Sequence, residues 1–137
     1  MKAISIRQPF AWLIAQGSKN IENRTWTTPY RGSVLIHAGR HVDPGLLAQF
    51  NLAVKEQNPG TPAPLVHIGG IIGIVDLVDI VTTSDNEWFN GPYGWVLANA
   101  RPLEFHPCAG KLGIFDVDYP HQIDSTPQES WLYELVK

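Results

Sequence analysis

Glycine and proline divide this chain into short segments, and their spacing limits the folds that it can form. The sequence holds 12 glycines and 11 prolines among 137 residues. Glycine permits bent or left-handed backbone and proline lacks a backbone hydrogen-bond donor, so both interrupt regular elements. Within the apolar stretch 67–81, Gly69, Gly70 and Gly73 permit the bends of a small barrel. The spacing therefore favours many turns and short or bent strands.

The pattern of apolar residues predicts several strands and two helices. Alternation and short apolar runs predict strands over residues 3–6, 21–26, 33–38, 67–81, 93–100, 112–117 and 131–136. Helices are expected over 9–16 and 44–57, the second with Asp43 as its N-cap. Loops or turns are expected over 28–32, 39–43, 58–64, 86–92 and 101–111. Together these elements indicate an α+β fold: a small, partly open β-barrel with two or three flanking helices.

The first expected helix ends in front of a glycine. Gly17 suits the position after a helix end, where a positive φ is favoured. Inside the helix, Phe10, Leu13 and Ile14 recur at helical spacing and are expected to pack against the core. Trp12 lies on a different face from Phe10, so we expect it to flank a cleft.

Length and composition set further bounds. A chain of this size is expected to form one domain over residues 1–137. It has one cysteine, Cys108, which excludes an internal disulfide and a cysteine-rich zinc site. No signal peptide or membrane-spanning stretch is visible, so we expect a cytoplasmic location. The nucleotide-binding motifs GxxxxGKS/T and GxGxxG are absent, and no cofactor is expected.

Charge is unevenly distributed along the chain, whose net charge is −3. Residues 1–42 contain six lysines and arginines and one acidic residue, whereas residues 43–137 contain four basic and twelve acidic residues. A basic segment on an acidic body indicates one anion-attracting surface, unless folding intermixes the two. Generic coating of nucleic acid is disfavoured, because that function normally requires a much more basic domain.

The stretch Gln16–Trp26 contains more charged and aromatic side chains than a turn requires. It places Lys19, Glu22 and Arg24 between a helix-ending glycine and Trp26. Turns normally use Gly, Asn, Asp and Ser, not three charges of mixed sign and an indole. If residues 21–26 form a strand, Glu22, Arg24 and Trp26 share one face. We interpret this stretch as the wall of a polar cleft.

Three blocks of the sequence occur in an informative order. They are Ser5-Ile-Arg-Gln-Pro-Phe-Ala-Trp12, Gly17-Ser-Lys-Asn-Ile-Glu-Asn-Arg-Thr-Trp26 and Arg31-Gly-x-x-x-Ile-His37-Ala. Together they resemble the ASCH domain family, which is related to the PUA domains of RNA-binding proteins. Asn90-Gly-Pro-Tyr-Gly-Trp-Val-Leu97 also resembles a later strand of bacterial and phage members. The resemblance implies a PUA-like β-barrel with a cleft lined by Lys19, Glu22 and Arg24, and a nucleic acid, nucleotide or modified base as the ligand.

The resemblance also raises the question of catalysis. Some small members of the family are amidohydrolases that remove the acetyl group from N4-acetylcytidine. They use the motif lysine, a threonine three residues further on and a distant glutamate; here Glu22 stands at the threonine position. The chain is more similar to a larger subgroup with RQPF/YA and GxKxxExRxW motifs.

The candidate site residues follow from these motifs, and each has a structural alternative. The candidate catalytic residues are Lys19 and Glu22, and the candidate ligand-binding residues are Arg7, Gln8, Trp12, Arg24, Trp26, Arg31, His37 and Arg40. As alternatives, Lys19 is a solvated residue, Glu22 forms an ion pair with Arg24 or Arg31, and His37 is a hydrogen-bonded strand histidine. The tryptophans are equally candidates for the core, where Trp95 is expected. No metal site is expected, because Gly39 interrupts the helical register that His37 and His41 would need to bind zinc.

Three functions remain open from the residues taken together with this resemblance. The first is an RNA- or nucleoside-binding domain, in which Arg24 and Arg31 hold phosphate, Trp12 or Trp26 stacks on a base and Glu22 reads a base edge. The second is a metal-independent amidohydrolase for N4-acylated cytidine, with Lys19 activating water or attacking the amide and Glu22 moving a proton. The third is a non-catalytic regulatory adaptor, which would show an exposed apolar patch around Lys19. The expected partner is RNA or a modified nucleoside or nucleotide, with no membrane involved.

Overall fold

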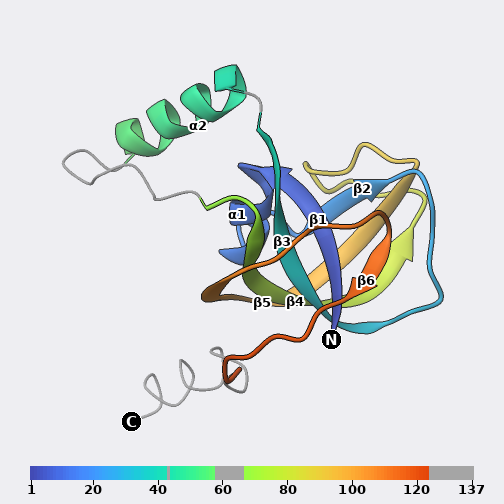
Figure 1. The fold of residues 1–137 in the computed structure, drawn as a ribbon. Helices are drawn as coiled ribbons and strands as arrows, with labels where there is room; N and C mark the ends of the chain where they lie inside the picture. Colours follow the sequence, from blue (N-terminus) through green and yellow to red (C-terminus); the bar gives the residue numbers. More distant parts are fainter. Residues whose placement is uncertain (43, 58–66, 124–137) are drawn as a thin grey trace, which may run out of the picture.

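The backbone forms six strands and two helices. The computed structural model describes residues 1–42, 44–57 and 67–123. In chain order the elements are β1 (Lys2–Gln8), α1 (Phe10–Ala15), β2 (Ile21–Arg24), β3 (Gly32–Val42), α2 (Pro44–Gln57), β4 (Gly70–Val81), β5 (Tyr93–Pro107) and β6 (Ile114–Asp116). Figure 1 shows α1 against the sheet and α2 set apart from it. The predicted α+β class is therefore confirmed.

The strands form one curved sheet in the order β2-β5-β4-β3-β1-β6. Neighbours are antiparallel except for β1 and β3, which run parallel. The sheet is barrel-like but open, since β2 and β6 are its two edges. β6 pairs with Lys2, Ala3 and Ile4 of β1, so the edge of β1 beyond Ile4 is not covered by β6. There Arg24 of β2 reaches across and donates a hydrogen bond from Nη2 to the carbonyl oxygen of Ser5 at 2.8 Å.

A glycine lets α1 lie close against β4. A Cβ atom at Gly73 would lie 2.6 Å from Cβ of Ala15, so any larger residue would push the helix away. Ile14 packs inward as predicted and is fully buried. Phe10 is partly buried and packs against the core, as predicted, whereas Leu13 is only partly buried. The core inside the curved sheet also contains Trp95, in agreement with its predicted burial.

Two predicted loops are continuations of strands. β3 extends to Val42, which lies opposite Gln8 of β1. β5 extends to Pro107, which lies opposite Gly70, and Pro102 falls where the register with β4 shifts. Proline is tolerated at such an irregularity and at a strand end, so its local signal did not end the strand. In both segments, hydrogen bonding to strands that are distant in the sequence determines the extended conformation.

The remaining predictions can be compared directly with the described residues. α2 begins at Pro44 and ends at Gln57, as predicted. Its Phe50 meets Trp12 of α1 edge-on, with ring centroids 5.3 Å apart. No helix in the described part of the chain is long and apolar enough to cross a membrane. The expected Asp43 cap, the loop 58–64 and the strand 131–136 lie outside the described residues.

Candidate functional site

The end of α1 positions Lys19. The N–H of Gly17, at a φ of 83°, donates to the Ile14 carbonyl at 3.0 Å, and the N–H of Ser18 donates to the Leu13 carbonyl at 2.9 Å. These two bonds form a Schellman motif and confirm the role predicted for Gly17. The chain reverses direction there. The side chain of Lys19 consequently lies next to the helix end, where it is buried and only 5% exposed.

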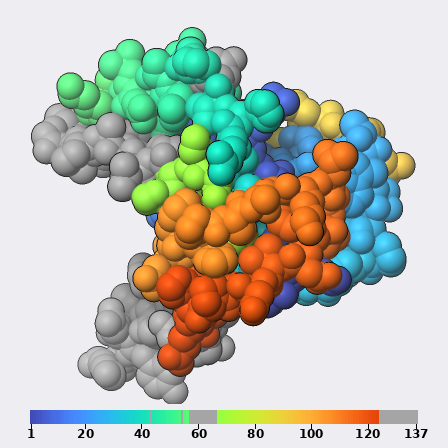
Figure 2. Space-filling model, in the orientation of Figure 1, coloured from blue at the N-terminus to red at the C-terminus, as the bar shows by residue number. Residues whose placement is uncertain are grey.

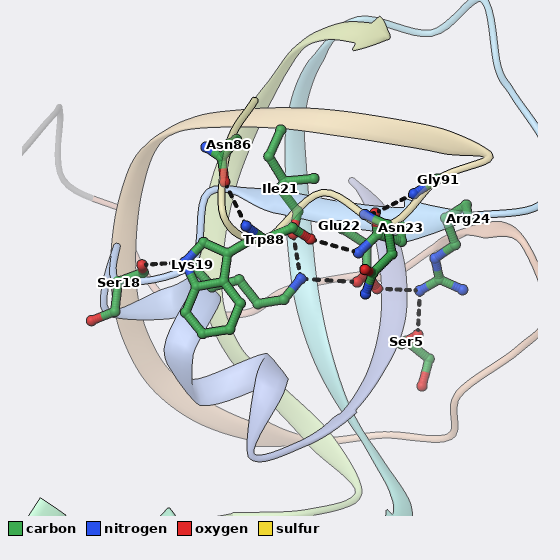
Figure 3. Close-up of polar contacts among 11 residues, drawn as sticks. Ser5, Ser18, Lys19, Ile21, Glu22, Asn23, Arg24, Asn86, Trp88 and Gly91 are labelled. Atoms are coloured by element: carbon green, nitrogen blue, oxygen red, sulfur yellow. Dashed lines mark hydrogen bonds and ion pairs between the residues drawn. The ribbon is translucent and has the colours of Figure 1, made fainter. Parts of the chain in front are cut away.

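Lys19, Glu22 and Arg24 form a continuous polar row (Figure 3). The Lys19 ammonium donates to the Ile21 carbonyl and lies 3.5 Å from Oε1 of Glu22. The other carboxylate oxygen of Glu22 lies 3.1 Å from Nη2 of Arg24, which also binds the Ser5 carbonyl. Alternation along β2 puts Glu22 and Arg24 on one face and buries Ile21 on the other, as the sequence predicts.

The surroundings of Lys19 change its proton affinity. Burial lowers the pKa of the Lys19 amine from its ordinary value of 10.5, and the neighbouring Arg24 charge lowers it further. The Glu22 carboxylate opposes both effects, since it favours the charged amine. Nζ also lies 5.8 Å from the ring centroids of Phe10 and of Trp88, within the range of a cation–π contact. The amine is thus held between one carboxylate and two aromatic faces.

The turn that carries Trp88 is fastened to β2. The side-chain amide of Asn23 donates to the Trp88 carbonyl at 2.9 Å, and its oxygen accepts from the N–H groups of Asn90 and Gly91. The indole N–H of Trp88 donates to the Ser18 carbonyl at 3.2 Å. The aromatic wall beside Lys19 is therefore fixed before any ligand arrives, which reduces the ordering cost of binding.

A pocket of about 450 Å³ opens beside this wall. Its lining consists of Phe10, Lys19, Glu22, Asn23, Glu87, Trp88 and Asn90. A second hollow of about 400 Å³ reaches Lys19 from the side of α1 and β5. The volume of the first lies in the lower part of the range for small-molecule sites, so it suits a ligand of nucleobase size. Lys19 is accessible to such a ligand although it is nearly buried.

A larger groove of about 1020 Å³ lies on the other side of Arg24. Its lining comes from β1, β2, β3 and the segment after β5: Ser5, Arg7, Arg24, His37, Gly39, Arg40, His41, Gly69 and residues 107–113. In Figure 1 the segment after β5 crosses in front of β3 and β1, and Figure 2 shows its orange surface beneath the teal end of β3. Among the described lining residues there are three arginines, one lysine and no carboxylate.

His37 lies in the floor of this groove and is 1% exposed. Its Nε2 lies 2.8 Å from the Cys108 carbonyl, which can only accept, so Nε2 carries a proton. Its Nδ1 lies 3.0 Å from Oγ of Ser5 and accepts from that hydroxyl in the neutral ring. Both ring nitrogens therefore have partners, which matches the structural alternative for His37. It joins the segment after β5 to β1 and β3.

The structure brings some sequence-predicted residues together and places others elsewhere. Arg7, Arg24 and Arg40 line the groove with His37, while Lys19 and Glu22 line the pocket. The other four predicted ligand-binding residues make contacts within the protein instead. Gln8 is buried, donates a hydrogen bond to the His67 carbonyl and accepts one from the Trp12 N–H. Trp12 packs on Phe50, and Trp26 packs on Trp95. Arg31 donates hydrogen bonds to the carbonyls of Thr28 and Tyr30. None of these four lines the pocket beside Lys19 or the groove.

Several site residues were missed from the sequence, and three of them matter most for the chemistry of the two sites. Trp88 and Phe10, rather than Trp12 and Trp26, are the aromatics beside Lys19. Lys111 joins the three arginines of the groove. A signal existed for Trp88, since an indole in the predicted turn 86–92 exceeds what a turn needs. Among the described residues, no three His, Cys, Asp or Glu side chains lie close enough together to hold a metal ion.

The open, curved sheet with α1 at its side defines an α+β domain of PUA-like fold. The chain belongs to the ASCH domain family, whose model matches residues 4–131. It is 30% identical over 82 residues, 58% of this chain, to mouse (Mus musculus) activating signal cointegrator 1, and it spans 14% of that protein's length. The fold resembles ASCH from Zymomonas mobilis with a TM-score of 0.53 and 16% identity, covering 98% of this chain and 94% of the other. A mutant of the same Zymomonas mobilis protein gives a TM-score of 0.52 with 16% identity and the same coverage.

Proposed function

We propose that this ASCH domain binds an unpaired nucleobase, from RNA or from a free nucleoside, in the pocket beside Lys19. The observation that carries the proposal is the pocket lining, in which a cation and a carboxylate 3.5 Å apart lie beside the aromatic rings of Phe10 and Trp88. Aromatic rings stack on the face of any base, and a neighbouring donor and acceptor read its edge. The relationship of the ASCH family to RNA-binding PUA domains supports the same class of ligand.

The polar pair favours a particular kind of base edge. The Glu22 carboxylate accepts hydrogen bonds, whereas the Lys19 ammonium donates them. A base with an exocyclic amino group beside a ring acceptor, as in cytosine, satisfies both partners. Uracil offers a carbonyl where cytosine has the amino group, so it would place an acceptor against Glu22. We therefore expect cytidine to bind more tightly than uridine.

Titration of the intrinsic tryptophan fluorescence, to which Trp88 in the pocket contributes, with cytidine, uridine and short RNAs at low and moderate salt tests the proposal. In Glu22→Gln the preference for cytidine over uridine should fall by about tenfold, the value of one charge-assisted hydrogen bond. Glu87→Gln is the matched control, because Glu87 lines the same pocket and the change in charge is identical. The control should keep the preference. Absence of binding to every nucleoside and RNA by the wild type would refute the proposal.

A second candidate function rests on the placement of Lys19 and Glu22 3.5 Å apart in the pocket, where burial also lowers the pKa of the Lys19 amine. A neutral amine can take a proton from water, and that water can attack the acyl carbon of an N4-acylated cytidine. The bond between the acyl carbon and N4 then breaks as N4 receives the proton taken from water, passed on by Lys19 and Glu22, and cytidine and the carboxylic acid are released. Lys19→Met should abolish release of acetate from N4-acetylcytidine while thermal unfolding shows an intact fold. A wild-type protein that releases no acetate would exclude this reaction.

A further inference from the structure

We infer that the basic groove is a second binding site, which holds the sugar–phosphate backbone of a single nucleic-acid strand. The inference rests on the proposed function, because the unpaired base of that strand is the one that enters the pocket beside Lys19. It adds a restriction on the ligand: a free nucleoside fills only the pocket, whereas a strand fills the pocket and the groove together.

The charges of the groove are of one sign. Arg7, Arg24, Arg40 and Lys111 line it, and no described lining residue is acidic, although the whole chain has a net charge of −3. Within the described part of the chain, Arg7, Arg40 and Lys111 form no ion pair with a carboxylate. Their side chains are exposed, so they attract an anion without first losing an internal partner. Four cations along one groove match the repeating charge of a phosphodiester chain.

The shape of the groove also suits a polymer backbone. Gly39 and Gly110 lie so close to the floor that a Cβ at either position would lie 3.1 Å from Oγ of Ser5 or 2.8 Å from Cε1 of His37. Because the added Cβ would meet the floor itself, glycine at these positions lets β3 and the segment after β5 pack closely against Ser5 and His37, which fixes the shape of the groove. With about 1020 Å³, the groove has more than twice the volume of the pocket, about 450 Å³.

Arg24 connects the two sites. Its contacts to Glu22 and to the Ser5 carbonyl both use Nη2, and no partner of Nη1 occurs among the described residues. The same guanidinium thus touches the residue that reads the base and lines the groove that holds the phosphate. A phosphate on Arg24 would lie next to a base on Glu22, as in one nucleotide. A base in a duplex is paired and cannot enter the pocket, so the geometry points to a single strand.

The experiment measures fluorescence anisotropy of a labelled single-stranded RNA over a series of salt concentrations. Four phosphate contacts predict a slope of log K against log salt of about −2.8, and Arg40→Ala with Lys111→Ala should reduce it to about −1.4. Affinity of that double variant near 0.1 M salt should fall about 25-fold. The matched control is Arg31→Ala with Lys55→Ala, which removes two exposed charges outside both sites. Its slope should equal that of the wild type.

Three results would overturn the inference. They are equal slopes for the two double variants, no strand binding by the wild type at the lowest salt, and equal affinity for a duplex of the same length. Cytidine titration separates this inference from the proposed function, since the groove variant should bind cytidine as the wild type does. If nucleosides fail to bind while the groove variant still loses strand affinity, the pocket proposal fails and the groove remains. Thermal unfolding of all variants verifies the fold.

Discussion

The pocket beside Lys19 and the basic groove show two ways of using charge. In the pocket the two least exposed ionic groups are paired: Lys19 faces Glu22, and Glu22 also faces Arg24. In the groove Arg7, Arg40 and Lys111 are exposed and have no ion pair in the described part of the chain, and no described carboxylate lines it. Both sites lie within reach of one side chain, Arg24. The contrast therefore arises from neighbouring residues and not from a difference between distant parts of the molecule.

The difference suggests a division of labour between selectivity and affinity. Buried, paired charges lose hydration and gain orientation, so they discriminate between ligands by the hydrogen bonds that a wrong ligand leaves unmade. Exposed charges of one sign gain affinity from long-range attraction, and that gain falls as salt rises. The pocket should consequently set which base binds, and the groove should set how tightly a strand binds.

The largest expected effect is at Arg24, because it belongs to both sites. Arg24→Ala removes a charge-assisted bond to Glu22 and the bond to the Ser5 carbonyl. We expect a loss of about 1.5–3 kcal/mol in the free energy of unfolding, and a loss of about tenfold or more in affinity for both nucleoside and strand. Urea unfolding and the two titrations measure these quantities. Arg24→Lys should retain part of the affinity for the strand. If Arg24→Ala weakened the binding of only one of the two ligands, Arg24 would not connect the two sites.

An intermediate effect is expected from the buried amine as pH changes. The pKa of Lys19 is lowered from 10.5 by burial, so between the lowered value and 10.5 the unfolded chain binds more protons than the folded chain. The Lys19 contribution to the free energy of unfolding should therefore rise with pH across that window, and below it the cost of burying the charge is present in full. In Lys19→Met this rise should be missing, as urea unfolding at a series of pH values would reveal. Parallel curves for the two proteins would contradict the assignment, and Lys55→Met controls for loss of a lysine.

The smallest effect is expected at Arg31, which the sequence placed in the ligand site. Its guanidinium bonds the carbonyls of Thr28 and Tyr30 and lines neither the pocket beside Lys19 nor the groove. Arg31→Ala should change strand affinity by less than about twofold, because an exposed charge outside the site is screened by salt. Anisotropy titration measures the change. A large loss would mean that the ligand extends beyond the groove to the turn before β3.

The polar row could be predicted because it depends on neighbours in the sequence. A glycine after α1 and the alternation of a short strand were enough to place Glu22 and Arg24 on one face near Lys19. The burial of Lys19 was not predictable, since it depends on Phe10 and on Trp88, which lies in a distant turn. Asn23 fastens that turn across 65 residues of sequence, a contact that no local pattern contains.

The groove could not be predicted from local sequence patterns either, because its residues are distant from one another in the sequence. Arg7, Arg40 and Lys111 come from three separate segments, and β1–β3 pairing together with the segment after β5 brings them together. The excess of basic residues in 1–42 indicated an anion-attracting surface, and three of the four cations in the groove come from that segment. The tryptophans show where residue type misleads: Trp12 and Trp26 carry stacking surfaces, but both are partly buried and pack against Phe50 and Trp95.

The hydrogen bond from Arg24 to Ser5 has a mechanical consequence. A closed barrel is held together at every seam by a ladder of backbone bonds, and parting two strands breaks several of them at once. Here the seam between β2 and β1 is bridged by a side chain, and rotating that guanidinium sacrifices a bond worth about 1.5–3 kcal/mol while leaving the six-stranded pairing untouched. Exchanging the Ser5 carbonyl for a ligand phosphate would therefore replace one partner of Arg24 by another, at no cost in backbone hydrogen bonds.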